Sequence, residues 1–554
     1  MKSFIVLAAL LVALALGFVL RASPSTGDRR AVDGVWGSLG SAESDYRMRL
    51  VELSLATEHA PSRDRFLSAR GSDDVPWPPL LHSALAVGFA HTLEQDPSAL
   101  ELRGLTEEQL EEARQRVGPL LALLAILALA AAASLVGGSR SGTLCGIVAA
   151  FLYAVHPLAV PREAAGELHA HSLVVLFAAV AIAGLAVALR GAEKIDVMVG
   201  ALVGGVCAAL GQLSGPEAWS VSLAIAGAFV VRAVRAPRER KREAWRVVLA
   251  YAASAFAVFS IPRDDGASWR VLPDASSGGL LAAAPATMLV ALLFVVVGVV
   301  LAWRARSEPL TLVLFASTAL SLACALVDRR FFAPLCASSV LLVALGVGAR
   351  QLSAARLALL GFSALALSAL PSVVEPRRDS KPGEALRTAL RWLRERSSSP
   401  GAFNHPEAEQ SWRVAAPAPL AGSVALHARR GLVSASFDGV SATVFGPDLL
   451  AARTPTELAA ALARHDAPYL VLSPLVLSEL SEEDARASFL AQLALDPTLA
   501  LDGALEAVYV STSWCTIEGA CETEGERVGP AVAIYRRLGA GGSGEPRPAE
   551  ATVR

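Results

Sequence analysis

Residues 162–190 read REAAGELHAHSLVVLFAAVAIAGLAVALR, a short polar stretch followed by an apolar one that meets no charged residue before Arg190. A bilayer core about 30 Å thick is crossed by roughly 20 apolar residues in a helix. A helix is required because backbone polar groups in lipid must find their hydrogen-bond partners within the segment. The stretch after His171 has that length. It predicts a membrane-spanning helix that begins at a polar loop.

Stretches of this kind recur along the chain, and composition agrees with them. Of the 554 residues, 54% are hydrophobic and 18% are charged, which excludes an ordinary soluble enzyme. The apolar residues form unbroken blocks, which also excludes a coiled coil, a collagen-like chain and a disordered polymer. The eleven predicted spans are 4–20, 119–136, 143–160, 172–189, 196–213, 217–234, 247–262, 279–303, 309–327, 331–349 and 355–372.

Lys and Arg in the short loops predict the orientation, because such residues favour the cytoplasmic side. They gather in alternate loops, most densely between residues 235 and 246. The protein is thus expected to be integral to the inner, cytoplasmic membrane. The first apolar stretch is either a cleaved signal peptide or a retained anchor. The segments predicted to lie outside are the loops 21–118, 162–171 and 263–278, the turn 328–330 and everything after residue 373.

The fold class predicted from these features is an α-helical polytopic membrane protein of about 11 spans with a C-terminal extracytoplasmic α/β domain. In that domain residues 383–396 and 456–465 are typical of amphipathic helices, and YLVLS near 469, LEAVYV near 505 and AVAIY near 531 are typical of short strands. The predicted domains are a membrane domain over 1–372 with its long first external loop 21–118, the α/β domain over 373–538, and a disordered tail over 539–554.

Six cysteines divide into two groups. Four of them fall in predicted spans, where a free cysteine is most simply a small buried apolar residue. The other two, Cys515 and Cys521, lie in SWCTIEGACE of the exported domain. An oxidising compartment would allow them to close a small disulfide loop. A metal pair is the alternative, although no second Cys or His pair stands at a suitable spacing.

The first external loop contains SAESDYRMRLVELSL at 41–55. The spacing of Asp45, Tyr46, Arg49 and Glu52 predicts a helix beside the membrane. Its apolar side is expected to consist of Met48, Leu50, Val51 and Leu53. Asp45 stands at the start of this helix, where an anionic cap is favourable, and capping alone would explain it. The sequence WPPLL that follows at 77–81 predicts a further helix at the membrane interface, opened by proline and too short to span.

The second external loop carries Glu167, His169 and His171 directly before a span. Two histidines separated by one residue, next to a carboxylate, can approach one divalent cation if the backbone is extended or turning. On an ideal helix their side chains would diverge by about 200°, which opposes joint ligation. The pattern therefore suits both a metal site and a pair of ordinary loop histidines.

The order of these pieces resembles the catalytic subunit of oligosaccharyltransferase, a GT-C type glycosyltransferase. That family has an early Asp in its first external loop, then Y-x-x-R and WPPL in its prokaryotic branch, then R-x-x-x-G and a D-x-D, or Asp with His, before a span. Later segments also match, since ALRTALRWLRERS resembles the family's ALxWLRENT and APLAGSVALHARRGLVSASF resembles DYGxxIxxxARRPVVxxxF. The matching residues of the external loops are Asp45, Tyr46, Arg49, the WPPL at 77–80, Arg162, Gly166, His169 and His171.

The resemblance implies a metal-dependent enzyme that moves a glycan from a polyprenyl diphosphate carrier to an acceptor, a protein above all, outside the cytoplasm. It assigns catalysis to Asp45, Arg162, His169 and His171, and assigns the metal to Asp45, His169 and His171. The divalent ion is Mn²⁺ or Mg²⁺, with Zn²⁺ as a further candidate, since imidazole ligands favour Mn²⁺ or Zn²⁺ over Mg²⁺. The implied partners are a lipid-linked glycan, an acceptor polypeptide or glycan, and membrane lipid. The net charge of −2 gives no reason to expect nucleic acid.

Three further residues are assigned to substrate binding. A third carboxylate is expected in the loop 263–278, where Asp264, Asp265 and Asp274 stand and no family motif selects one of them. Asp274 is assigned to substrate binding, and all three also suit a solvated loop. Arg329 and Arg330 lie on the predicted outer side despite the cytoplasmic preference of basic residues. They are assigned to the carrier diphosphate, and contact with anionic lipid headgroups is the alternative.

The largest departure from the family concerns the acceptor. The family reads it with a Trp-Trp-Asp motif, whereas this chain has SWRVAAPAPLAGS there, with Trp412 well upstream and no aspartate. A pocket without the indoles and the carboxylate cannot hold the acceptor hydroxyl in the same way. Two alternatives follow. One is a polyprenyl-phosphate-sugar transferase that acts on lipid or envelope glycan, and the other is a catalytically silent relative that binds a carrier lipid or a partner.

Overall fold

The chain, seen in a computed structural model, forms two compact units. The first unit comprises Met1–Ser25, Pro76–Leu81 and Ala113–Pro376, and the second unit comprises Thr26–Val75, His82–Glu112 and Arg377–Arg554. Most of the predicted first external loop therefore belongs with the C-terminal part of the chain. The structure describes residues 2–22, 42–57, 61, 64, 66, 75, 79–92, 105, 107–259, 280, 285–350, 363, 365–366, 383–397, 401–402, 405–406, 413–433, 447–479, 482–502, 504–515 and 529–538.

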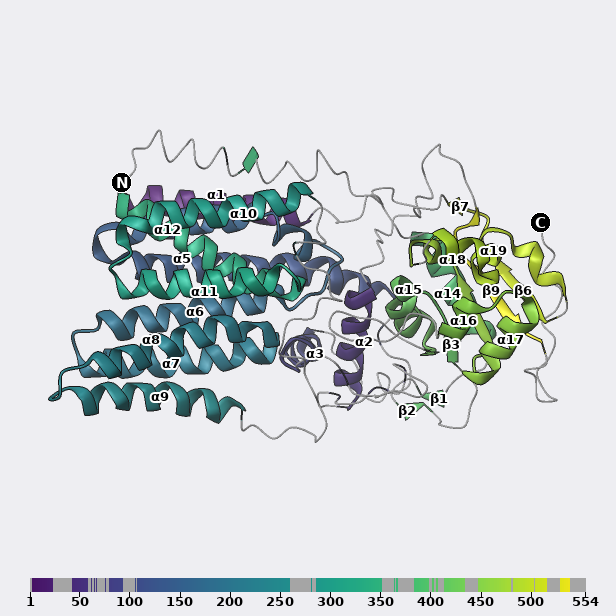
Figure 1. Cartoon of the computed structure of the whole chain (residues 1–554), viewed down its shortest axis with the longest axis horizontal. Helices are drawn as coiled ribbons and strands as arrows, with labels where there is room; N and C mark the ends of the chain where they lie inside the picture. The colour runs from purple at the N-terminus through teal and green to yellow at the C-terminus, as the bar shows by residue number, and fades with distance from the viewer. Residues whose placement is uncertain are drawn as a thin grey trace. The chain divides into compact units, whose positions relative to one another are not determined.

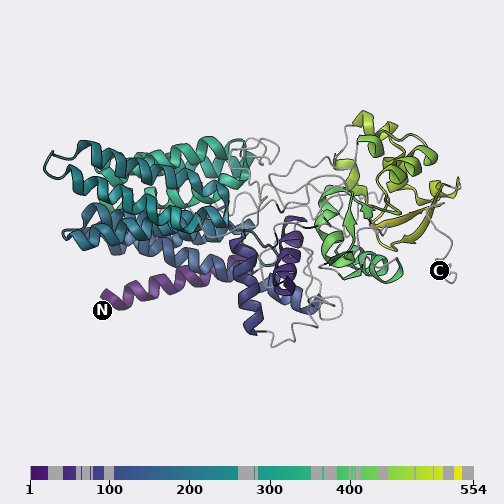
Figure 2. The same cartoon turned by 90° about the horizontal axis from the view of Figure 1, so that it is seen from below.

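The first unit is a bundle of long apolar helices that run side by side (Figures 1 and 2). Short 3₁₀ segments join several of them: η1 (Val160–Arg162), η2 (Pro216–Ala218), η5 (Trp303–Ala305) and η6 (Arg329–Phe331). The long helices are α1 (Lys2–Ala22), α5 (Glu107–Ala154), α6 (His171–Arg190), α7 (Lys194–Ser214), α8 (Trp219–Arg235), α9 (Lys241–Phe259), α10 (Pro285–Ala302), α11 (Pro309–Ala325) and α12 (Phe332–Arg350).

Seven helical segments among the described residues are long and apolar enough to cross a membrane. They confirm the prediction of an integral, polytopic membrane protein. The predicted spans 143–160 and 309–327 correspond to shorter apolar helices, Ser141–Ala154 and Pro309–Ala325. α9 covers most of the span predicted at 247–262. The span predicted at 355–372 lies outside the described residues apart from residues 363, 365 and 366, so the number of eleven stays a prediction.

α5 is two helices joined at a break, which explains why one element covers two predicted spans. At Gly138 the backbone has φ 68° and ψ −167°, a conformation that is not helical and that glycine adopts without strain. The two halves pack closely against each other. A Cβ added at Gly146 would lie only 2.9 Å from the carbonyl oxygen of Ala130, so the approach depends on glycine at this position. A Cβ at Gly142 would meet the backbone of Ser134 in the same way. The halves therefore form an antiparallel pair.

α12 is the central element of the first unit. Every residue from Phe332 to Gly348 is buried. The helix packs against α6, α10 and α11. At Gly346 an added Cβ would come within 2.6 Å of the backbone at Leu301 and Ala302, so the helices approach closely because glycine stands there. Helices nearer the outside instead expose large apolar side chains such as Phe256, which is 72% exposed and suited to lipid contact.

α6 and α7 also pack through small residues. A Cβ at Gly184 of α6 would lie 2.7 Å from the carbonyl oxygen of Gly200. Conversely, a Cβ at Gly200 of α7 would lie 2.6 Å from the backbone nitrogen of Ala188. Without a hydrophobic driving force between helices in lipid, such close backbone approach supplies the van der Waals contact that joins them.

The second unit joins two helices of the predicted first external loop to the C-terminal part of the chain. The early helices are α2 (Ala42–Thr57) and most of α3 (Leu80–Thr92), which begins directly after Pro79 as predicted. α2 packs against α15 (Ala418–Ser423) and against the π-helix η7 (Val424–Ala428). α14 (Gly383–Arg396) also packs against η7 and has the bounds predicted from the sequence.

A five-stranded mixed sheet forms the C-terminal core, with strand order β4–β3–β5–β9–β6. β3 is parallel to β4 and β5, whereas β9 is antiparallel to β5 and β6. Leucines of α17 and α19 pack with those of β5 in its hydrophobic core. The strands are β3 (Arg413–Ala415), β4 (Gly431–Leu432), β5 (Tyr469–Leu472), β6 (Leu505–Val510) and β9 (Ala533–Arg537), and the helices after β4 are α16 (Pro447–Ala451), α17 (Pro455–Arg464), α18 (Glu482–Ala487) and α19 (Phe489–Leu495).

Smaller elements complete the second unit. The 3₁₀ segments η8 and η9 flank α18 and α19, and two short antiparallel pairs, β1 with β2 and β7 with β8, lie outside the main sheet. Their bounds are η8 (Pro474–Glu479), η9 (Pro497–Asp502), β1 (Gly401–Ala402), β2 (His405–Pro406), β7 (Trp514–Cys515) and β8 (Gly529–Pro530). The predicted disulfide is not tested, because the side chain of Cys515 and all of Cys521 lie outside the described residues, as does the tail 539–554.

Candidate functional site

The segment 162–171 connects η1 to α6 and carries three of the predicted site residues. Gly166 within it has φ 88°, in the left-handed region that favours glycine, which gives the glycine of the R-x-x-x-G pattern a structural reason. His171 is the first residue of α6, and His169 stands before the helix begins. The divergence expected for two histidines on one ideal helix therefore does not apply.

The two histidines differ in their surroundings. The Nε2 atom of His169 lies 3.1 Å from Oε2 of Glu167, and both side chains are only about one-tenth exposed. His171 is 4% exposed, and its Nε2 atom has no hydrogen-bond partner within the described part of the chain. A buried polar atom without a partner is unfavourable by about 1–3 kcal/mol and points to a ligand or a water molecule.

Arg162 is the third predicted residue of this segment. Its guanidinium lies over the ring of Phe332, 5.4 Å from the ring centroid. A cation over an aromatic face is attracted by the ring quadrupole. The side chain is partly buried, so the contact orients a cation at the edge of the first unit.

Glu163, next to Arg162, ties the segment to three helices. Its Oε2 atom accepts a hydrogen bond from Nε of Arg21 at 2.7 Å, in α1. Its Oε1 atom accepts from Oγ of Ser172 at 2.7 Å, in α6, and from the hydroxyl of Tyr153 in α5. All four side chains are at most 2% exposed. Arg21 donates in addition to the carbonyl oxygens of Gly17, Tyr153 and Ala154.

Asp45 belongs to the second unit, where it is completely buried in the first turn of α2. Its Oδ2 atom accepts a hydrogen bond from Oγ of Ser423 in α15. The helix begins at Ala42, three residues earlier, so the predicted role of Asp45 as the N-cap is wrong. A carboxylate in the first turn still gains from the positive end of the helix dipole.

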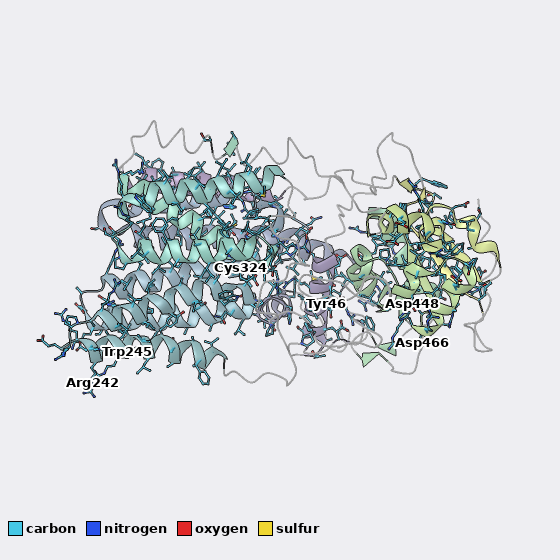
Figure 3. The ribbon with its side chains drawn as sticks, viewed as in Figure 1. Tyr46, Arg242, Trp245, Cys324, Asp448 and Asp466 are labelled. Carbon is cyan, nitrogen blue, oxygen red and sulfur yellow. The ribbon has the colours of Figure 1, made fainter. Side chains whose placement is uncertain are left out.

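The remainder of α2 is held by buried charges on a face that was not expected to be buried. Arg49 donates to both carboxylate oxygens of Asp64, at 2.7 and 2.8 Å, and the hydroxyl of Tyr46 donates to the same group at 2.9 Å (Tyr46 is labelled in Figure 3). Burial, which lowers the pKa of Arg49, is outweighed by Asp64, so this pKa is raised. Glu52 accepts from Arg429 at 3.1 Å. The helix is therefore buried beyond its apolar side.

The predicted substrate-binding arginines lie at η6 and differ from each other. Arg330 donates through Nε and Nη2 to Asp328 at 2.6–3.1 Å, and Asp328 is fully buried. This carboxylate balances the charge of Arg330. Arg329 is exposed. Asp274, the third predicted residue, lies outside the described residues.

In the described ranges, no group of three His, Cys, Asp or Glu side chains is placed to hold a metal ion. Asp45 belongs to the second unit, and His169 and His171 belong to the first. Joint ligation by all three therefore stays a prediction. Within the first unit, Nε2 of His169 lies beside the carboxylate of Glu167, and Nε2 of His171 is buried.

Comparison with solved structures identifies the fold. The archaeal oligosaccharyltransferase AglB from Archaeoglobus fulgidus, in complex with an inhibitory peptide and a dolichol-phosphate, is 13% identical with a TM-score of 0.68 over 97% of this chain and 89% of that chain. Its complex with Zn and sulfate is 12% identical, with a TM-score of 0.69 over 96% and 88%. The arabinofuranosyltransferase AftD from Mycobacteria is 17% identical, with a TM-score of 0.55 over 97% of this chain and 42% of that chain.

The chain has the GT-C fold. The structures that share it are 12–17% identical to this chain, so the likeness concerns the fold alone. No family model matches the sequence, and no curated protein matches it either. Because unrelated chemistries share folds, the fold by itself does not assign an activity.

Several polar residues of this GT-C chain were not found by sequence reasoning. Glu163, Ser172 and Tyr153 are ordinary loop and helix residues in the sequence, and no spacing links them. Arg21 stands at the end of an apolar stretch, where an arginine usually extends towards the interface. Its complete burial is the opposite of that expectation. Ser423 lies 378 residues from Asp45, so only the folded chain shows their contact.

Proposed function

We propose that this GT-C chain is a membrane glycosyltransferase that moves a glycan from a polyprenyl diphosphate carrier to an acceptor, in the first place a protein, on the extracytoplasmic side of the inner membrane. The observation that carries the proposal is the extent of the fold. The likeness to the A. fulgidus oligosaccharyltransferase covers 97% of the chain and so includes both units. That enzyme was solved with a peptide and a dolichol-phosphate, which supports a lipid-linked glycan, an acceptor and membrane lipid as partners.

Positively charged side chains can stabilise the departing diphosphate. As the bond to the carrier breaks, negative charge develops on the leaving oxygens, and preorganised cations stabilise it. Arg162 is proposed for this role, because its guanidinium is oriented by Phe332. Arg329 is proposed as an exposed second cation. Arg330 contributes less, because Asp328 balances its charge. Asp274 remains a proposed substrate-binding residue.

A divalent ion, Mn²⁺, Mg²⁺ or Zn²⁺, is proposed at Asp45, His169 and His171. The donor types fit, since imidazole nitrogens and a carboxylate bind Mn²⁺ and Zn²⁺. The buried Nε2 atom of His171, which no described residue bonds, supports a ligand at this position. When bound, the ion would supply Lewis-acid stabilisation of the leaving diphosphate. The likeness to a structure with Zn and sulfate is a further support.

A transfer assay tests the proposal. The protein in lipid nanodiscs is incubated with lipid-linked glycans extracted from membranes and with a panel of peptide and glycan acceptors. We expect a glycosylated acceptor and released carrier. Asp45→Ala and His171→Ala should each abolish transfer, whereas the control His465→Ala, at the end of α17 beside Asp448 and 21% exposed, should not. Unchanged transfer in Asp45→Ala and His171→Ala would reject the site.

A second candidate function has its own support in the likeness to the arabinofuranosyltransferase. It is a polyprenyl-phosphate-sugar transferase that acts on lipid or envelope glycan. Use of a monosaccharide-phosphate donor without any peptide acceptor would favour it over the first proposal. Consumption of neither donor class by folded protein would overturn both and favour a silent, carrier-binding relative.

Metal dependence is a separate prediction. Dialysis against a chelator should strongly lower transfer, because the leaving diphosphate loses its Lewis-acid stabilisation, and Mn²⁺ or Zn²⁺ should restore it. Bound metal measured by mass spectrometry on purified protein should fall in His171→Ala and stay unchanged in His465→Ala. Full activity in a chelator, with no metal bound, would contradict the metal site.

A further inference from the structure

The two ends of the segment 162–171 meet at one buried carboxylate. Glu163 directly follows Arg162, and Ser172 directly follows His171. Oγ of Ser172 donates to Oε1 of Glu163 at 2.7 Å, which closes the segment into a loop. We propose that Glu163, fixed by Arg21, is the positioning residue that sets the locations of Arg162 and His171. The proposal rests on the proposed function.

The carboxylate of Glu163 can be buried because hydrogen-bond donors surround it. A buried carboxylate is expensive to desolvate unless it is paired and its oxygens are hydrogen-bonded. Arg21 supplies the pairing through Nε, at 2.7 Å, and Ser172 and Tyr153 supply neutral donors to the other oxygen. The remaining guanidinium nitrogens of Arg21 donate to carbonyl oxygens, at 2.7 Å for Ala154 and 3.1 Å for Tyr153. The guanidinium therefore has one defined orientation.

Backbone contacts hold the interior of the segment as well. The backbone nitrogen of Ala165 donates to the carbonyl oxygen of Arg21 at 2.6 Å. On α5, a Cβ added at Gly118 would lie 2.9 Å from the carbonyl oxygen of Glu167 and 3.0 Å from that of Glu163. The segment thus rests directly on the helix backbone at Gly118. It is fixed along its length and at both ends.

This arrangement matters for chemistry because neighbouring residues cannot move independently. Consecutive Cα atoms are about 3.8 Å apart, so a displacement of Glu163 or Ser172 carries Arg162 or His171 with it. A misplacement of about 1 Å in a reacting group can lower a rate by about a hundredfold. We therefore expect loss of the carboxylate contacts to reduce turnover in protein that is still folded.

A matched pair of serine substitutions provides the first test. Ser172→Ala removes one bond to Glu163. The control Ser220→Ala removes a buried bond in α8, where Oγ of Ser220 lies 3.0 Å from Oγ of Ser321. Hydrogen–deuterium exchange over residues 163–171 should become about tenfold faster in Ser172→Ala and stay unchanged in Ser220→Ala. In the transfer assay, kcat per folded protein should fall about tenfold in Ser172→Ala only.

A second test separates positioning from stability. Arg21→Met leaves Glu163 buried without this cation and should lower the melting temperature strongly. The double variant Arg21→Met/Glu163→Leu replaces the whole pair by apolar side chains, which is often neutral or stabilising. It should therefore melt above Arg21→Met, although the buried hydroxyls of Ser172 and Tyr153 lose their acceptor. It should nevertheless show fast exchange over 163–171 and low kcat, because no carboxylate remains to hold Ser172.

The outcomes distinguish this proposal from the proposed function. If the wild-type protein transfers no glycan, the proposed function fails, and the exchange data still decide whether Glu163 fixes the segment. If transfer occurs but Ser172→Ala and the folded double variant behave as Ser220→Ala does in both exchange and kcat, the positioning role is overturned. Slow exchange with low kcat would equally overturn it, since the loss would then not arise from movement of the segment.

Discussion

Arg49 shows how much one buried charge depends on one partner. Its side chain is 1% exposed, and Asp64 receives two of its hydrogen bonds. Asp64→Ala should destabilise the second unit by about 3–5 kcal/mol, because it removes this partner of a buried guanidinium. Asp448→Ala is the matched control, since Asp448 pairs with an Arg464 that is 57% exposed (Asp448 is labelled in Figure 3). We expect less than about 1 kcal/mol there. Equal shifts in thermal unfolding would contradict the prediction.

His82 makes the stability of the second unit depend on pH. It is 1% exposed, and burial, followed by the charge of Arg47, lowers its pKa to about 3. An unfolded histidine titrates near 6.5, so below that pH the unfolded chain binds the extra proton and the folded chain does not. Stability is therefore full above about pH 6.5 and is lost as the pH falls towards 3, by about 2 kcal/mol at pH 5. His82→Leu should show a weaker decrease in melting temperature between pH 7 and pH 5, and an unchanged decrease would refute this.

Four of the proposed site residues stand near one another in the sequence, and their proximity in the structure follows from that. Arg162, Gly166, His169 and His171 lie within ten residues, and the structure keeps them in one segment. Asp45 was found by its place in a resemblance, but its contact with Ser423 depends on the tertiary fold. A buried ion pair such as Arg21 with Glu163 has no local signature, because its partners stand 142 residues apart in the sequence.

The close packing of α6 against α7 depends on glycines, which have no side chain. At Gly184 an added Cβ would lie 2.7 Å from a backbone oxygen of α7, whereas at Gly227 in α8 nothing lies within 4 Å. Gly184→Ala should therefore destabilise the first unit by about 1–3 kcal/mol through overpacking. Gly227→Ala should be neutral or slightly stabilising, since alanine favours helix. The melting temperature in detergent measures both, and equal effects would contradict the close packing.

The long helices were predictable because their signal is local and strong. A span needs about 20 consecutive apolar residues, and this requirement is visible without knowledge of any partner. The strands β3 and β4, of three and two residues, carry no such signal, since β3 depends on its pairing with β4 and β5, and β4 depends on its pairing with β3. The π-helix η7 was missed for a similar reason, because it packs between α2 and α14 and its form is set by those contacts. The break in α5, in contrast, was predicted, because Gly138 lies between the spans expected at 119–136 and 143–160.

Placement of the chain in the membrane gives a prediction for the whole protein. The basic residues around Arg242, with Trp245 beside them at the start of α9, belong to a loop predicted to face the cytoplasm (Figure 3). On that orientation the C-terminal residues lie outside. Alkaline phosphatase fused after residue 538 should be active, and green fluorescent protein fused there should be dark. A fluorescent fusion with inactive phosphatase would reverse the orientation and remove the extracytoplasmic site.

Low identity and a shared fold are compatible in this protein. Most positions of a membrane bundle must only be apolar or small, so 13% identity over 97% of the chain can preserve the path of the helices. The composition of the spans thus fixes the class of fold, while the loops and the second unit decide the chemistry.

The enclosure of α12 has a consequence for biogenesis. Its packing neighbours α6, α10 and α11 all precede it in the chain, so they leave the ribosome first. Those earlier helices cannot complete their packing before then, because their contacts with α12 form only after residue 350 has entered the bilayer. The bundle therefore closes only after α12 has entered the bilayer, and the faces of the earlier helices that will contact α12 stay uncovered by protein until then.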